Sequence, residues 1–180
     1  MKKALLAVDY TVDFVADHGR LTCGKPGQAI HDKIVAITEQ FLDQGDFIVF
    51  PVDLHEEEDQ LHPETKLFPP HNIRGTEGRN LYGDLKNLYE SNSDNIVWMD
   101  KTRYSAFAGT RLELMLRERN IEELHIVGVC TDICVLHTAV DAYNRGFKIV
   151  IHQDAVASFD PEGHKWALRH FTNTLGAVVL

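Results

Sequence analysis

Three residues of this 180-residue chain could together perform nucleophilic chemistry: Cys134, Asp9 and Lys101. A cysteine attacks as its thiolate, so it needs a group that accepts the thiol proton and a neighbour that stabilises the resulting charge. Asp9 could accept the proton, and Lys101 could supply a positive charge. From spacing alone each residue also has an ordinary structural explanation, because free cysteines are commonly buried and polar residues commonly end strands.

Two thiols, Cys130 and Cys134, stand four positions apart in the segment "VGVCTDICV". We expect Thr131 or Asp132 to cap a helix, which places Cys134 in the first turn, where the helix dipole favours a thiolate. Cys130 precedes that helix and is the weaker candidate for the nucleophile. A disulfide is the least expected explanation, since three cysteines cannot all pair, and Cys23 lies too far upstream to complete a zinc set.

A second group of residues has the composition of a metal site. Asp53 and His55 are two positions apart, so in an extended segment their side chains point the same way. His62, Glu64 and His71 follow in a stretch without clear secondary structure, and so long a loop is usually functional. Two histidines with one or two carboxylates suit Zn²⁺, Mn²⁺ or Fe²⁺. Spacing alone leaves a solvated acidic loop as an equal alternative.

Three aromatic residues, Phe14, Phe68 and Tyr104, are near these groups in the sequence. They could form the walls of a pocket for a flat ligand. For any one of them, ordinary core or rim packing is the default explanation.

The elements that would position these residues are short apolar strands that alternate with longer amphipathic helices. The expected strands are Ala4–Val8, Phe47–Val52, Ile96–Met99, Leu124–Val129, Lys148–Ile151 and Ala177–Val179. The expected helices are Gln28–Gln44, Leu81–Glu90, Thr110–Arg119, Ile133–Arg145 and Pro161–Thr174, with Gly45 and Gly146 as C-terminal stops.

This alternation predicts an α/β fold, a three-layer sandwich in which a mostly parallel sheet of about six strands has helices on both faces. Ligands bind beyond the carboxyl ends of the strands in such sheets. Asp9, Asp53, Lys101 and the two thiols each follow a different one of the first four expected strands. We therefore expect these groups to meet at one edge of the sheet.

The bulk composition limits the partners. Net charge is −9, which argues against nucleic acid or an anionic membrane as the main partner, and 44% of residues are hydrophobic, enough for a single domain over residues 1–180. The apolar run at Ala4–Val8 is too short for a signal peptide or a membrane span. We expect a cytoplasmic protein.

The whole chain resembles the isochorismatase-like cysteine hydrolases and, within them, the nicotinamidases. The resemblance rests on four segments: "VDYTVDF", "VDLHEEE…HPETKLFPPHN", "DKTRYSAFAGT" and "GVCTDICVLHTAVDAY". The second of these narrows the match, because many relatives lack a metal there. The chain departs from many members at Thr11, where they have Gln, and at Phe68, where they have Trp. Both departures are expected to touch the pocket wall more than the chemistry.

The resemblance implies roles for the residues. It implies a catalytic triad of Asp9, Lys101 and Cys134, and one divalent metal ion per subunit, most often Zn²⁺ with Mn²⁺ or Fe²⁺ as alternatives. The implied metal ligands are Asp53, His55 and His71, with Glu64 binding directly or through water. The backbone N–H groups of Cys130 and Cys134 would form an oxyanion hole, next to a cis peptide bond that precedes Cys130.

The implied activity is hydrolysis of nicotinamide to nicotinate and ammonia through a cysteine thioester, as a step of NAD salvage. The metal would bind the pyridine nitrogen, and Phe14, Phe68 and Tyr104 would flank the ring. The family also suggests a homo-oligomer. Three alternatives remain open from the residues: an amidase for another carboxamide, a metallohydrolase that uses metal-bound water, and a binding module without catalysis.

Overall fold

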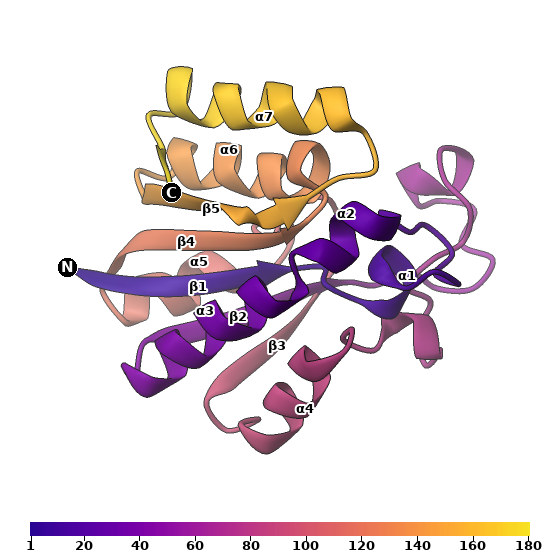
Figure 1. Ribbon diagram of the computed structural model, residues 1–180, viewed down its shortest axis with the longest axis horizontal. Helices are drawn as coiled ribbons and strands as arrows, with labels where there is room; N and C mark the ends of the chain where they lie inside the picture. Colours follow the sequence, from indigo (N-terminus) through magenta and orange to yellow (C-terminus); the bar gives the residue numbers. More distant parts are fainter.

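The structure, a computed structural model of residues 1–180, is built on one six-stranded sheet in which all neighbouring strands are parallel (Figure 1). The spatial order is β3-β2-β1-β4-β5-β6. The strands are β1 (Lys2–Val8), β2 (Phe47–Asp53), β3 (Ile96–Lys101), β4 (Ile121–Val129), β5 (Lys148–Ala157) and β6 (Val178–Val179). The predicted α/β sandwich of about six strands is confirmed.

Helices cover both faces of the sheet. One side carries α1 (Val12–Val15), α2 (Gly24–Ala29), α3 (His31–Asp43) and α4 (Asp84–Ser91). The other side carries α5 (Leu112–Glu118), α6 (Leu136–Asn144) and α7 (Pro161–Asn173). Two short 3₁₀ turns, Pro63–Lys66 and Glu77–Arg79, lie in the long segment after β2, and a π-helical turn, Thr131–Val135, precedes α6.

The central strands are buried on both faces, as their uninterrupted apolar runs predict. In β1, Ala4, Leu6 and Val8 belong to the core beneath α5, α6 and α7. Leu5 and Ala7, which alternate with them, belong to the core beneath α3 and α4. Successive side chains of a strand point to opposite faces, so a strand with helices on both sides must be apolar at every position.

Four of the five expected helices begin elsewhere in the structure; α5 and α6 begin at Leu112 and Leu136, after the expected Thr110 and Ile133. The helix expected over Gln28–Gln44 is divided at Ile30, whose N–H bonds to the Gln28 carbonyl, so that α2 and α3 are separate. The helix expected from Leu81 begins only at Asp84, because Gly83 precedes it with φ +57° and cannot be part of a right-handed helix. Gly45 and Gly146 have φ +66° and +75° after α3 and α6, as expected of C-terminal stops.

Gly128 explains how β4 approaches β1 just before the two thiols. A Cβ at this position would overlap the Val8 carbonyl oxygen, and its φ of +113° suits glycine alone. The register between β4 and β5 shifts at the same point, and β5 continues to Ala157, beyond the expected end at Ile151. The irregularity allows the last residues of β4 to lie close to the end of β1.

No helix combines the length and apolar character that crossing a bilayer requires.

Candidate active site

The carboxyl ends of β1 and β3 and the π-helical turn after β4 bring three of the candidate residues together. Lys101, the last residue of β3, places its ammonium nitrogen 2.7 Å from Asp9 Oδ2 and 3.7 Å from Cys134 Sγ. All three side chains are buried, and none is more than 5% exposed. A carboxylate, an ammonium group and a thiol from distant parts of the sequence therefore lie in one compact cluster.

Asp9 is held rigidly immediately after β1. Its φ of +54° is unusual for a residue with a side chain, and such conformations cluster at functional sites. Its N–H donates to the Pro51 carbonyl at 3.1 Å, and its Oδ1 accepts the Asp53 N–H at 2.7 Å. Oδ2 is an ion-pair partner of Lys101 by distance but accepts no hydrogen bond of good geometry. Burial raises the pKa of Asp9, against the effect of the Lys101 ammonium, so this carboxylate is a better proton acceptor than an exposed one.

Lys101 is completely buried between two carboxylates. Its ammonium lies 3.3 Å from Asp53 Oδ1 in addition to its contact with Asp9, and it donates to the Arg103 carbonyl at 3.1 Å. Burial alone would lower the pKa of Lys101, but the charges of Asp53 and Asp9 outweigh it and raise that pKa well above its ordinary value. Lys101 is therefore a permanent cation beside the thiol.

The Cys134 thiol is neutral in this arrangement. Burial raises its pKa well above the ordinary value, the Lys101 ammonium opposes this, and the charges of Asp9 and Asp53 add to it. Cys134 lies in the π-helical turn that leads directly into α6, and burial at this position outweighs the stabilisation of a thiolate that we expected from a helix N-terminus. A nucleophilic thiolate must instead form by proton transfer within the site.

The expectation that Thr131 or Asp132 caps the helix is wrong, because both side chains make contacts with other segments instead. Thr131 Oγ1 lies 2.8 Å from His164 Nδ1 of α7, and Asp132 Oδ1 accepts the Ser158 hydroxyl at 2.6 Å. These contacts fasten the thiol-bearing turn to the segment that leads from β5 into α7. The turn is thus positioned by tertiary contacts and not by local capping.

The backbone before this turn contains the cis peptide bond that the family resemblance implied. The Val129–Cys130 peptide bond is cis. No backbone hydrogen bond of the turns and loops has the Cys130 N–H as its donor.

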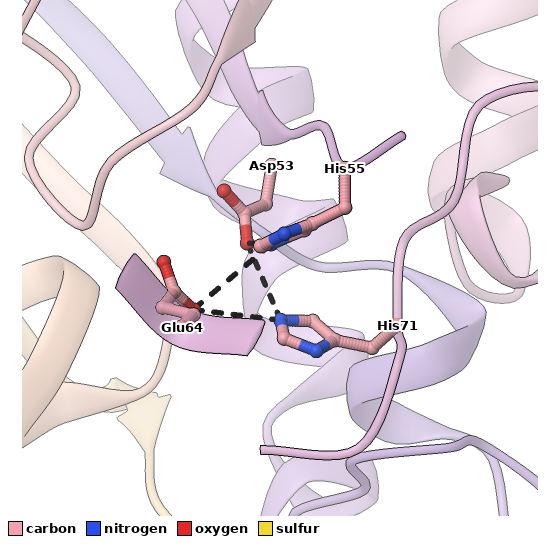
Figure 2. A group of neighbouring side chains, drawn as sticks. All are labelled: Asp53, His55, Glu64 and His71. Atoms are coloured by element: carbon pink, nitrogen blue, oxygen red, sulfur yellow. Dashed lines mark hydrogen bonds and ion pairs between the residues drawn. The ribbon is translucent and has the colours of Figure 1, made fainter. Parts of the chain in front are cut away.

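The candidate metal ligands converge from three segments (Figure 2). Asp53 ends β2, His55 follows it, Glu64 is carried by the first 3₁₀ turn, and His71 comes from the loop after that turn. One ligand atom from each of the four lies within 4.8 Å of the others, and all four residues are buried. Ligands at about 2.0–2.2 Å from one ion lie up to about 4.4 Å apart, so the cluster has the dimensions of a single metal site.

The bonding within the cluster supports this interpretation. His55 Nε2 lies 2.8 Å from Asp53 Oδ2, whereas His71 Nε2 is buried without a hydrogen-bond partner, 3.5 Å from Asp53 Oδ2 and 3.7 Å from Glu64 Oε2. The other ring nitrogen of His71 lies 2.8 Å from the Pro69 carbonyl, which fixes the orientation of the ring. A buried nitrogen without a partner, aimed at two carboxylates, fits a divalent cation.

His62, which the sequence placed near this group, has a different position. Its Nδ1 accepts the Glu64 N–H at 3.2 Å, and its Nε2 lies 2.7 Å from the Thr102 carbonyl. It therefore caps the 3₁₀ turn that carries Glu64 and ties that turn to the segment after β3. It is not a member of the four-residue cluster.

A cavity joins the two groups of residues. Its lining combines Cys134 and Cys130 with Glu64 and His71 of the cluster and with the three aromatic residues singled out in the sequence, Phe14, Phe68 and Tyr104. Phe14 and Phe68 meet the His71 ring edge to face, at centroid distances of 5.2 and 6.3 Å. The remaining lining residues, which sequence reasoning missed, are Leu21, Ile133 and Phe159.

Thr11 does not line this cavity, contrary to expectation. It is fully buried, and its hydroxyl donates to Asn72 Oδ1 at 2.9 Å, while the Asn72 N–H donates to Asp13 Oδ2 at 2.7 Å. This network supports the loop that continues from His71. The departure at position 11 therefore affects loop support, and Phe68 alone of the two departures touches the cavity.

Comparison with known proteins agrees with this geometry. Residues 3–180 match the model of the isochorismatase domain. The chain is 65% identical to nicotinamidase/pyrazinamidase PncA from Bacillus subtilis, with 99% of each chain covered and a TM-score of 0.97. It is 54% identical to pyrazinamidase/nicotinamidase from Streptococcus mutans, covering 99% of this chain and 100% of that one, with a TM-score of 0.97. It is 29% identical to a pyrazinamidase of Pyrococcus horikoshii solved in complex with zinc, covering 100% and 99%, with a TM-score of 0.88.

Proposed function

The chain belongs to the isochorismatase family, and we propose that within it this protein is a nicotinamidase that hydrolyses nicotinamide to nicotinate and ammonia. One observation carries the proposal. A single cavity is lined both by Cys134, the buried thiol next to Lys101 and Asp9, and by Glu64 and His71 of the four-residue metal cluster. High identity to nicotinamidases over the whole chain supports the choice of substrate.

The first step is attack by Cys134. Asp9, whose pKa is raised by burial, takes the thiol proton, and Lys101 stabilises the thiolate. The thiolate sulfur bonds to the amide carbon, and the carbonyl electrons move to oxygen. The N–H groups of Cys130 and Cys134 hold that oxyanion, and one such donor typically contributes about 10²–10³ in rate.

The intermediate collapses as Asp9 returns its proton to the departing nitrogen, which leaves as ammonia. A thioester on Cys134 remains. Asp9 then accepts a proton from a water molecule that attacks the thioester carbon. The carbon–sulfur bond breaks, Asp9 passes the proton to the departing Cys134 sulfur, and the released acid ionises to nicotinate. Throughout, Lys101 keeps its charge, because its pKa is well above neutrality.

The substrate ring would lie between Phe14, Phe68 and Tyr104, which share the cavity with the thiol. Asp53, His55, Glu64 and His71 would hold one divalent ion, with Zn²⁺ best suited and Mn²⁺ or Fe²⁺ as alternatives. When bound, this ion supplies a Lewis-acid position that accepts the pyridine nitrogen and so orients the ring.

The remaining parts of the proposal follow from the substrate and the family. Nicotinate returns to NAD by salvage, so we place the protein in the cytoplasm as a homo-oligomer that acts on a free small molecule. Neither nucleic acid nor a membrane is part of the function.

The experiment that tests the proposal compares four amides by ammonia release. Nicotinamide and pyrazinamide each carry a ring nitrogen that benzamide lacks, and an N-carbamoyl substrate represents other amidases of the family. We expect turnover of the first two, at least about 100-fold faster than of benzamide. Equal turnover of benzamide would exclude ring orientation by the metal cluster, and turnover of the N-carbamoyl compound alone would identify a different amidase.

A further inference from the structure

Two thiols that form no part of the proposed triad lie in contact. Cys23 Sγ and Cys130 Sγ are 3.3 Å apart although the residues are separated by 107 positions in the sequence. Both side chains are buried and both are reduced. The sequence offers no sign of this pairing, since Cys23 stands alone near the N-terminus, far from Cys130.

The pair is reachable through the cavity. Cys130 lines the cavity together with Cys134 and Phe14, so a small molecule that enters the cavity comes into contact with this residue. Cys23 does not line the cavity, but its sulfur contacts that of Cys130, and its N–H donates to the carbonyl of the lining residue Phe14 at 2.8 Å. An oxidant no larger than the reacting part of the substrate could therefore act here.

Closing the pair into a disulfide requires a small movement. The S–S bond length is about 2.05 Å, so the sulfurs would approach by about 1.2 Å. Both residues lie at junctions and not inside regular elements. Cys23 directly precedes α2, next to Gly24 with φ +59°, and Cys130 connects β4 to the π-helical turn. A shift of this size can be taken up without breaking a helix or a strand.

We propose that Cys23 and Cys130 are a modification site, at which a hydroperoxide produces a reversible disulfide that slows the enzyme. In the first step a cavity-facing Cys130 thiolate attacks the peroxide, gaining oxygen as a sulfenic acid and releasing water or an alcohol. In the second, the Cys23 thiol attacks the Cys130 sulfur, forming the disulfide and releasing water. Two thiols are oxidised and one hydroperoxide is reduced.

The effect on hydrolysis rests on the proposed function, whereas disulfide formation does not. Pulling the Cys130 sulfur toward Cys23 displaces the residue whose N–H is the proposed oxyanion donor. The hydrogen bond to Cys23 and burial raise the pKa of Cys130 well above its ordinary value, so oxidation should be slow at neutral pH and faster in alkaline buffer.

The first test isolates the pair. In a Cys134→Ala variant, Cys23 and Cys130 are the two remaining thiols. After treatment with hydrogen peroxide at pH 7 and pH 9, free thiols are alkylated and peptides are mapped by mass spectrometry. We expect a Cys23–Cys130 disulfide that forms faster at pH 9 and is reversed by dithiothreitol. Recovery of two alkylated or over-oxidised thiols, without the disulfide, would overturn the proposal.

The second test measures the consequence. Wild type, Cys23→Ala and Cys23→Ser are exposed to the same peroxide dose, and ammonia release is measured before and after dithiothreitol. The oxidised wild type should lose about 100-fold in kcat, the loss typical of one oxyanion donor, and recover on reduction, while both variants keep their rate. Equal loss in all three would place the damage at Cys134 and overturn the regulatory role. Peptide mapping of the oxidised wild type detects the disulfide without any substrate. The disulfide is therefore tested separately from the proposed function, even if nicotinamide is not hydrolysed.

Discussion

Lys101 Nζ lies 3.3 Å from Asp53 Oδ1, and this contact joins two groups of residues that spacing treats as separate. The other oxygen of Asp53 faces the metal cluster, 2.8 Å from His55 Nε2. Burial would raise the pKa of Asp53, but the Lys101 ammonium and the hydrogen bond with His55 hold it well below its usual range. Asp53 is therefore a permanent anion shared by the thiol group and the metal cluster.

The first prediction concerns the buried charge of Lys101. Lys101→Met keeps the length of the side chain but leaves the carboxylates of Asp9 and Asp53 without their cation. Removing one partner of a buried ion pair typically costs about 3–5 kcal/mol. We expect a loss of this size in the free energy of unfolding, measured by urea denaturation in the presence of a chelator.

Lys86→Met is the matched control, because Lys86 forms an exposed pair with Glu90 at 3.8 Å. Exposed pairs contribute little, so the change should stay within about 0.5 kcal/mol. If Lys101→Met were no more destabilising than this control, the buried charges could not be paired as the structure has them.

The second prediction concerns metal content. Wild-type protein should bind one divalent ion per chain, and His71→Ala should weaken that binding by at least about 100-fold, since even outer partners of metal ligands contribute 10- to 100-fold. Elemental analysis after dialysis, together with the rise in Tm on adding Zn²⁺, measures this directly. His18→Ala, at an exposed histidine outside the cluster, should bind like wild type. Full metal occupancy in His71→Ala would remove His71 from the ligand set.

The third prediction concerns the aromatic wall. Phe68 lines the cavity, and its ring meets the His71 ring edge to face. Phe68→Ala should lower kcat/KM for nicotinamide by about tenfold, equivalent to about 1.4 kcal/mol of lost ring contact. Phe68→Trp, which keeps an aromatic ring at this position, should retain activity. Leu67→Ala is the control, because the neighbouring Leu67 is 64% exposed. An equal effect of Phe68→Ala and Leu67→Ala would argue against a role for Phe68 in holding the ring.

The fourth prediction concerns pH and lies away from the site. His125 Nδ1 and His152 Nε2 are 2.8 Å apart on β4 and β5. Burial, with the charges of His125, Lys33 and Lys3, lowers the pKa of His152 to about 4. The unfolded chain, with an ordinary histidine pKa of about 6.5, then binds more protons than the folded protein between these two values.

The contribution of the neutral His152 to the free energy of unfolding should therefore be fully present above about pH 6.5 and be lost as the pH falls toward about 4. His152→Gln removes the titration, so the free energy of unfolding of this variant should fall less between pH 7 and pH 4 than that of wild type. Urea titrations of both proteins in chelator measure the difference, because the other titrating groups are common to both. Parallel pH profiles would show that His152 is not held neutral by the fold.

Much of this arrangement could be predicted from the sequence. Buried parallel strands must be apolar along their length, and their carboxyl ends share one edge, so the polar residues at the ends of β1, β2 and β3 had to lie near one another. Asp53 and His55, two apart in an extended segment, point to the same side as expected.

The rest depends on tertiary contacts that have no local signal. Thr131 and Asp132 have the chemistry of helix caps, but His164 and Ser158 engage them instead, and the turn that carries Cys134 becomes π-helical. The neutral state of the thiol follows from burial, which spacing does not reveal. Phe159 reaches the cavity from the segment between β5 and α7, whose path is set by packing.

The measurement that tests the central claim most directly is ammonia release from nicotinamide by wild type, Cys134→Ala and Cys130→Ala, each with its metal content verified to be equal. We predict that Cys134→Ala loses at least about 10⁴-fold in kcat, as expected when the nucleophile of a catalytic triad is removed, while Cys130→Ala, which keeps its backbone N–H, stays active. A Cys134→Ala enzyme that works at the wild-type rate but stops when the metal is removed would contradict the account and identify a metallohydrolase.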